Sequence, residues 1–354
     1  GWPALGEELI VSRNAALAEL TGTPIHCQHL SAKGSVRVLR EARARSRVRR
    51  LTRREREVLE GVAGGMSNRM IGEKLAISPR TVEAYRKIRN TFRYLLSNLP
   101  DFDPATDALP LADLEEVDRY ILSRYGRLAA RVVDAYRTYD FQTIFQGINA
   151  FMTVDLSAFY LDVSKDRLYT FGANSRARRS AQTTAWRLAD GLARLVAPIL
   201  VFTSDEVWRH LPGARESSVH VADFPADAAA LVDDALEAKW AALLGARDVV
   251  NGALETARQR KDIGQNLMAH VTVRAGGALG RTLADAAADL PMFFITSAVT
   301  VDATADDAPV TVEVAKAAGE KCPRCWRYVT ETVADGPHAG LCLRCDDAIG
   351  GPRG

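Results

Sequence analysis

The sequence predicts a mainly α-helical protein, a helix bundle followed by a small α+β tail that binds a metal. Residues 114–140, 141–169 and 178–211 carry apolar residues at helical spacing, and the short loops between them favour antiparallel packing. Three strand-like runs (270–274, 292–302 and 310–317) and two cysteine pairs follow. With 354 residues, 47% of them apolar and 25% charged, the chain has room for two or three domains.

The first long segment shows the helical pattern most clearly. Its apolar residues recur every three or four positions, as expected for a helix with one buried face. The predicted core residues on this face are Val117, Ile121, Tyr125, Leu128, Val132 and Ala135.

Residues 1–45 form a separate N-terminal fragment that reads as helix, short strand and helix, a single βα step. The stretch TGTPIHCQHLSAKGSVRVLREA within it resembles the dihydroorotase branch of the amidohydrolases. The resemblance implies a metal ligand at His29, but the later sequence has no H-x-H strand and no closing aspartate to complete that site. We therefore expect no working metal site here, and we expect Cys27 to be a buried thiol.

Residues 46–86 carry the start signals of a helix-turn-helix. Thr52 and Glu55 have capping-box spacing, Ser67 precedes a second helix, and Ser78 with Pro79 precedes a third. The stretch LTRREREVLEGVAGGMSNRMIGEKLAISPRTVEAYR resembles the DNA-binding domain of LuxR/FixJ-type response regulators, although the fourth helix of that family is absent. The core that this resemblance implies is Leu51, Val58, Leu59, Ile71, Leu75, Ile77 and Val82. The face that it implies for the major groove is Arg80, Thr81, Glu83 and Lys87.

An arginine-rich run joins these two regions. Nine arginines stand against Glu41 and Glu55 between Arg40 and Arg56. Such a run is either a solvated linker or a contact for a phosphate backbone, and the sequence leaves both interpretations open.

Four cysteines near the C-terminus have the spacing of a zinc site. Cys322–Cys325 and Cys342–Cys345 are two C-x2-C pairs separated by 16 residues, which is typical of a tetrahedral site built from two knuckles. Four thiolate ligands leave no open position for a substrate, so we expect one structural Zn²⁺ per chain. His338 lies between the pairs, but the cysteines already complete the ligand shell.

Residues 82–354 resemble the C-terminal half of bacterial isoleucyl-tRNA synthetase, which is a class I synthetase. The matching words are KIRNTFRYLL, NLPDFDP, DLSAFYLDVSKDRLY, RRSAQT, APILVFTSDEVW and CPRCWRY…LCLRC, and they occur in the order of that family. The resemblance implies an anticodon-binding helical bundle over 87–225, a helix with a small β region over 226–318, and a zinc module over 319–354 that packs on tRNA.

Basic and aromatic residues suggest where RNA would bind. In the zinc module the candidates are Trp326, Arg324 and Arg327, although Trp326 could instead cover the knuckle. In the bundle, a candidate phosphate contact is more often a solvated or capping charge. These bundle candidates are Lys87, Arg89, Arg93, Arg176, Arg178 and Arg179.

The sequence contains no HIGH-like or KMSKS-like ATP signature and no editing domain, so we expect no independent aminoacylation. It shows no signal peptide and no apolar run that approaches the roughly 20 residues of a membrane helix. We expect a cytoplasmic monomer whose partner is tRNA, with the isoleucine acceptor as the first candidate. A LuxR/FixJ-type DNA-binding regulator and a non-functional chimera of three families are the alternatives.

Overall fold

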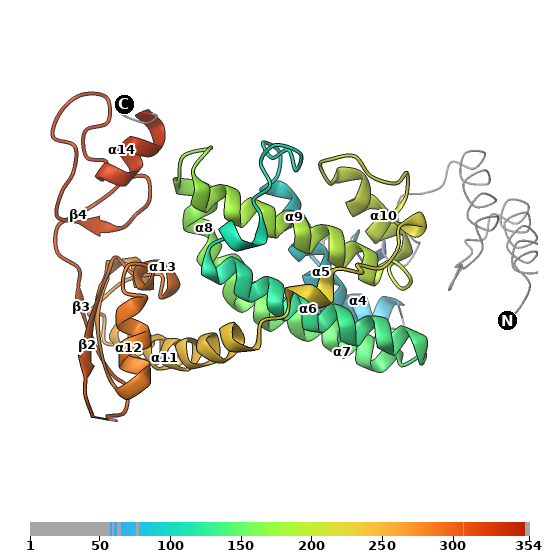
Figure 1. Cartoon of the computed structure of the whole chain (residues 1–354), viewed down its shortest axis with the longest axis horizontal. Coiled ribbons are helices and arrows are strands. Elements are labelled where there is room, and N and C mark those ends of the chain that lie inside the picture. The colour runs from blue at the N-terminus through green and yellow to red at the C-terminus, as the bar shows by residue number, and fades with distance from the viewer. Residues whose placement is uncertain (1–56, 59, 62–64, 76–77, 307, 351–354) are drawn as a thin grey trace, which may run out of the picture. The chain divides into compact units, whose positions relative to one another are not determined.

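The computed structural model describes residues 57–58, 60–61, 65–75, 78–306 and 308–350. Within these ranges the fold is mainly α-helical, with one small sheet and a cysteine cluster near the C-terminus, which confirms the predicted class (Figure 1). The predicted βα fragment, with Cys27 and His29, lies outside the described residues. The arginine-rich run and the proposed capping box of Thr52 and Glu55 lie outside them too.

The chain divides into two compact units, each assembled from segments that are not contiguous in sequence. Unit 1 comprises the described residues up to Asp107 together with Tyr125–Thr153 and Thr183–Ala230. Unit 2 comprises Ala108–Arg124, Val154–Gln182 and the described residues from Leu231 onward.

Unit 1 begins with the helix pair α4 (Asn68–Leu75) and α5 (Pro79–Ser97). Ser78 caps α5 as predicted, since its hydroxyl accepts hydrogen bonds from the backbone N–H groups of Arg80 and Thr81 at 3.1 and 3.3 Å, and Pro79 stands at the first helical position. The predicted helix-turn-helix core is confirmed where it is described, because Val58, Ile71, Leu75 and Val82 form one buried cluster with Tyr85.

Helix α5 packs on α10 (Val201–His210) in the same unit. Tyr85 Oη and Thr203 Oγ1 are hydrogen-bonded at 3.3 Å, and Arg89 pairs with Glu206 at 2.9 Å. The remaining elements of unit 1 are the later part of α6 (Glu116–Arg137), α7 (Phe141–Ala150), the later part of α9 (Arg176–Val196), and the short 3-10 turns Val219–Val221 and Ala228–Leu231. All six predicted core residues of the segment that forms α6 are buried.

Unit 2 contains the rest of the helical residues that follow Asp107. A π-helix, η2 (Phe151–Tyr160), runs directly into α8 (Leu161–Thr170), and the first part of α6 packs near α11 (Asp234–Gln259). Trp240 on α11 stacks on Tyr120 of α6 with ring centroids 5.0 Å apart, and it meets Phe293 edge-on at 5.4 Å. A 3-10 turn at Leu111–Asp113 precedes α6.

A buried ion pair fastens α6 to α8 inside unit 2. Asp118 accepts two hydrogen bonds from Arg167, at 2.6 and 2.8 Å, and the two side chains are 0% and 3% exposed. Tyr160 donates to the same carboxylate at 2.7 Å, and Ser180 of α9 also donates to it. Each lone pair of the carboxylate thus meets a donor, which is the condition under which a buried charge is tolerated.

A three-stranded sheet completes the α+β part of unit 2. Strand β1 (Ala269–Gly276) lies between β2 (Ala298–Thr304), which is parallel to it, and β3 (Thr311–Lys316), which is antiparallel. Helix α12 (Gly277–Asp285) packs on β1 and β2 as the crossover of a βαβ unit. In Figure 1, α12 lies against the sheet as a second layer.

The predicted strand run 292–302 is wrong in its first half. Residues Leu290–Phe293 form a short helix, α13, with Pro291 in its first turn, and the strand begins only at Ala298. Phe293 and Phe294 are buried. A short apolar run has the same appearance in a buried helix and in a buried strand, so periodicity alone could not separate the two.

The C-terminal module is built from short elements. Strands β4 (Glu320–Lys321) and β5 (Tyr328–Val329) pair antiparallel, and α14 (Leu343–Gly350) closes the module. A further 3-10 turn, Asn266–Met268, precedes β1. Across the described ranges, each helix is too short or too polar to cross a lipid bilayer.

Candidate metal centre and nucleic-acid interface

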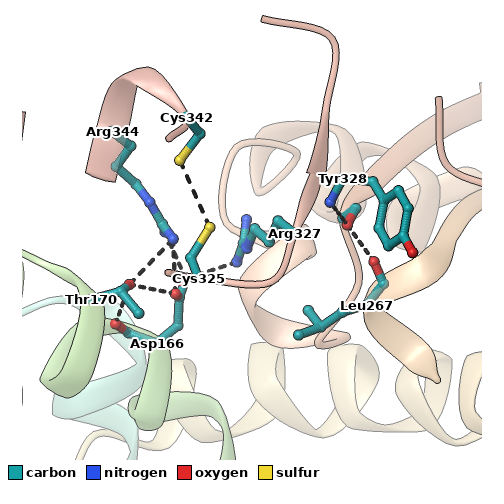
Figure 2. Close-up of polar contacts among 9 residues, drawn as sticks. Asp166, Thr170, Leu267, Cys325, Arg327, Tyr328, Cys342 and Arg344 are labelled. Atoms are coloured by element: carbon teal, nitrogen blue, oxygen red, sulfur yellow. Dashed lines mark hydrogen bonds and ion pairs between the residues drawn. The ribbon is translucent and has the colours of Figure 1, made fainter. Parts of the chain in front are cut away.

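The four predicted cysteine ligands converge on one point. Cys322, Cys325, Cys342 and Cys345 are all buried, and their sulfur atoms lie within 4.8 Å of one another. The sulfurs of Cys325 and Cys342 are 3.7 Å apart (Figure 2). That separation suits a shared metal, because Zn–S bonds of about 2.3 Å in a tetrahedron place sulfurs about 3.8 Å apart. It is far longer than a disulfide bond of about 2.05 Å.

The backbone of the first knuckle shapes this centre. Cys322 N–H donates to the carbonyl of Arg327, and Trp326 N–H donates to the carbonyl of Cys322, both at 2.9 Å. The tight turn places Trp326 in the left-handed region, with φ of 64°. A non-glycine residue rarely adopts this conformation, and here the hydrogen bonds on both sides hold it.

The polar surroundings favour a thiolate at Cys322. Burial by itself would raise its pKa, but the backbone N–H groups of Cys325, Cys342 and Arg324 lower the pKa of this thiol to about 6. One of these contacts, from Cys342 N–H to Cys322 Sγ, measures 3.4 Å. Burial instead raises the pKa of the Cys325 and Cys342 thiols, so these two ligands would bind Zn²⁺ with release of a proton.

His338 takes no part in the sulfur cluster. Its Nδ1 lies 2.7 Å from a carboxylate oxygen of Asp346, in the first turn of α14. With four buried thiols already convergent, the ligand set is complete, and the chemistry it supplies when zinc is bound is structural cross-linking of the two knuckles.

The predicted RNA-binding residues of the module differ in their surroundings. Trp326 is 55% exposed, and the Lys321 ammonium lies 5.4 Å from the centre of its ring. Arg327 instead pairs with Asp166 of α8 at 2.9 Å, and Arg324 donates to the backbone carbonyl of Thr170. Trp326 is therefore partly accessible, with a lysine over its ring, whereas the two arginines are engaged inside unit 2.

Several predicted phosphate contacts of the bundle also point to protein groups. Arg178 donates to the carbonyls of Leu168 and Ala173, at 3.2 and 3.1 Å. Arg179 donates to Gln182 and Asn174, and Arg176 binds Asp113. The bonds of Arg178 satisfy carbonyls at the end of α8 and in the loop that follows it, as a capping charge would.

The remaining bundle candidates lie on α5 in unit 1. Arg89 is paired with Glu206, and Lys87 with Glu83 at 2.8 Å. Arg93 is exposed and lines a cavity of about 550 Å³ between α5 and α10, together with Phe92 and His210.

The proposed DNA-reading face also lies on α5. Arg80, Thr81 and Glu83 are exposed near the start of the helix, and Lys87 follows one turn later on the same side. The Glu83 carboxylate reaches this lysine, whose hydrogen bond and charge lower the pKa of Glu83. The four residues thus share one helical face, in the way the helix-turn-helix interpretation requires.

Sequence reasoning missed two carboxylates that organise unit 2, Asp118 and Asp166. Both meet arginines far along the chain, 49 residues away for Asp118 and 161 and 178 residues away for Asp166. A signal was present for the first, because Asp118 interrupts the apolar stripe of an otherwise regular amphipathic helix. A charge in that position has to find a partner.

Comparison with known proteins assigns both parts of the C-terminal region. Residues 118–273 match the family described as the anticodon-binding domain of tRNA ligase. Residues 319–348 match the zinc finger found in FPG and IleRS. Residues 49–93 match the bacterial regulatory proteins of the luxR family.

Three relatives illustrate the similarity. The isoleucine–tRNA ligase of Geobacillus kaustophilus is 47% identical over 274 residues, which are 74% of this chain and 30% of the relative. That of Bacillus mycoides is 44% identical over 282 residues, 77% of this chain and 30% of the relative. That of Moorella thermoacetica is 43% identical over 302 residues, 81% of this chain and 32% of the relative. The chain spans about a third of the length of the curated relatives it matches.

Residues 118–273 therefore form a domain of the anticodon-binding type, and residues 319–348 form a zinc finger of the type found in FPG and IleRS. The homologues identify the particular kind of ligase: the C-terminal part of this chain is homologous to the anticodon-binding C-terminal region of isoleucine–tRNA ligases.

Proposed function

We propose that the C-terminal part of this chain binds tRNA, with isoleucine-accepting tRNA as its ligand. The observation that carries the proposal is that a zinc finger with an exposed tryptophan occurs together with an anticodon-binding domain in one chain. Exposed aromatic rings stack on unpaired bases, and arginine or lysine neutralises phosphates.

The contacts proposed for tRNA differ in weight. Trp326 is 55% exposed and has a lysine over its ring, so it is the leading candidate for a stacked base or a ribose. Arg93 is exposed, so it is the leading candidate for a phosphate contact. For Lys87, Arg89, Arg178 and Arg179, contact with RNA would require the exchange of a protein partner for a phosphate.

The relatives are named for joining isoleucine to tRNA. We propose that this chain supplies the tRNA-binding step of that activity. A reducing cytoplasm suits a protein with four metal-binding thiols, and we propose that the chain acts there as a monomer.

Filter binding tests the proposal with two RNAs, isoleucine tRNA and the same tRNA with an altered anticodon. We expect tighter binding to the first, with Trp326→Ala weakening it and Trp326→Phe retaining most of it. Equal, weak binding to both RNAs would contradict the proposal.

DNA binding is a second candidate, favoured by the luxR-family match and by the exposed face of α5. It predicts salt-sensitive binding to duplex DNA that is lost in Arg80→Ala and Lys87→Ala. Arg69→Ala is the matched control, because Arg69 is an exposed arginine of α4 that pairs with Glu73. Tight tRNA binding without any duplex binding would argue against this candidate.

A further inference from the structure

One carboxylate of α8 receives an arginine from each zinc knuckle. Asp166 accepts Arg327 Nη2 at 2.9 Å, and it accepts Arg344 Nη1 and Nη2 at 2.7 and 2.9 Å (Figure 2). Thr170 Oγ1 donates to the same carboxylate at 2.7 Å and receives Arg344 Nη2 at 3.2 Å. The Asp166 side chain is 19% exposed, so solvent screens these contacts only in part.

The metal centre determines where the two arginines lie. Arg327 follows the second cysteine of the first knuckle by two residues, and Arg344 stands between the two cysteines of the second. The backbone carbonyl of Arg327 is itself bonded to Cys322 N–H. Because the two knuckles are far apart in sequence, their arginines converge on one carboxylate only when the four sulfurs are held together.

The end of α8 offers these cations a second favourable feature. Arg324 donates to the last carbonyl of the helix, Thr170 O, and the Arg344 guanidinium lies 4.8 Å from the centre of the Phe171 ring. A helix C-terminus attracts positive charge because its last carbonyls have no partner within the helix and the negative end of the helix dipole lies there. Three arginines of the finger thus meet one acid and one helix end.

The charge balance at Asp166 supports a permanent contact. Burial by itself would raise its pKa, but the hydrogen bond from Arg344 and the charges of Arg327 and Arg344 lower it below the ordinary range. An ionised carboxylate and a guanidinium that binds both of its oxygens form one of the stronger polar contacts in proteins.

We propose that Asp166 is a positioning residue that docks the zinc-loaded module on α8 and thereby holds the exposed Trp326 in place for RNA. The RNA clause rests on the proposed function, whereas the docking clause does not. Arg327 and Arg344 then act on the protein, and their loss removes no phosphate contact.

Salt dependence separates this role from direct phosphate binding. A residue that contacts a phosphate contributes about 0.7–0.9 to the slope of log K against log salt. Asp166→Asn and Arg344→Gln should each lower tRNA affinity by roughly tenfold, because the Trp326 contact is no longer held in place beside the contacts of the bundle. Neither change should alter the salt slope. Asp166→Glu should recover most of the affinity, since it retains the carboxylate.

Asp162→Asn is the matched control. It makes the same change on the same helix, but Asp162 pairs with the exposed Lys165 and not with the finger. The rate of amide hydrogen exchange of residues 343–350, measured in the full chain without RNA, reports on docking. Metal analysis measures the zinc content. Asp166→Asn should speed this exchange and keep its zinc, whereas Asp162→Asn should change neither.

Four results would contradict the proposal in whole or in part. Unchanged exchange in Asp166→Asn would remove the docking role, and loss of its zinc would make Asp166 part of the folding of the module. A smaller salt slope in Arg344→Gln, with normal affinity in Asp166→Asn, would make the arginine a direct phosphate contact. Absence of tRNA binding by the wild-type chain would refute the proposed function and the RNA clause, while the exchange experiment would still decide docking.

Discussion

Replacing Asp118 by Asn should be among the most damaging single changes in unit 2. The substitution keeps the shape of the side chain but removes the negative charge that faces Arg167, and both side chains are almost fully buried. Burial by itself would lower the pKa of Arg167, but the charge and hydrogen bonds of Asp118 raise it. The arginine therefore stays charged and would lose its counter-ion.

The cost follows from what remains around Arg167. Its Nη1 keeps a long bond of 3.5 Å to the carbonyl of Ala177, and its Nε already has no hydrogen-bond partner within the described part of the chain. Breaking a buried pair by removing one partner costs about 3–5 kcal/mol. We expect the free energy of unfolding of unit 2 to fall by that amount, a large fraction of a typical total of about 5–15 kcal/mol.

Urea unfolding followed by tryptophan fluorescence measures this effect, because Trp240 stacks on Tyr120, two residues from Asp118. Asp113→Asn is the control, since Asp113 makes an exposed pair with Arg176 that should contribute less than about 1 kcal/mol. The double variant Asp118→Asn/Arg167→Met should recover more than half of the loss. A cost for Asp118→Asn below about 1 kcal/mol, or a double variant less stable than the single one, would refute the reasoning.

Three further predictions concern the metal, the RNA and an unpaired hydroxyl. Cys322→Ser should abolish the roughly one equivalent of zinc expected from a four-cysteine site, measured by metal analysis; retained zinc would place the metal elsewhere. Trp326→Ala should weaken tRNA binding by about 1–3 kcal/mol per lost stacking contact without a change in unfolding; unaltered affinity would leave Trp326 as a cover of the knuckle. The buried Tyr125 Oη has no partner among the described residues, and Tyr125→Phe should therefore stabilise unit 1 by about 1 kcal/mol in thermal unfolding; destabilisation would show that the hydroxyl has an ordered water as its partner.

Local patterns in the sequence predicted the parts of the fold that depend on near neighbours. The C-x2-C spacing brings each cysteine pair together within one turn, and the stripe from Val117 to Ala135 identifies the buried side of α6. The Ser78 cap required only the next three residues. In each case the partners lie close enough in the chain for spacing to imply contact.

Long-range pairing could not be predicted in this way. Nothing in the spacing of Asp166 and Arg344, separated by 178 positions, shows that they meet. The same limit applies to Arg178, whose bonds to the carbonyls of Leu168 and Ala173 were not predicted from the sequence. An arginine beside a helix end and an arginine beside RNA have the same local sequence, so spacing alone does not distinguish them.

Helix α5 belongs at once to the segment that matches regulatory proteins and to the segment related to tRNA ligases. Its buried residues, Val82, Tyr85, Ile88, Phe92 and Leu95, form one uninterrupted stripe across that junction. The stripe therefore fixes the rotation of the first half of α5 about the helix axis relative to the second half. One residue inserted at Arg86 would turn one half against the other by about 100°, whereas seven would nearly restore the phase and add about 10 Å of length. One helix can satisfy both matches because its buried stripe keeps a single phase over the residues where they overlap.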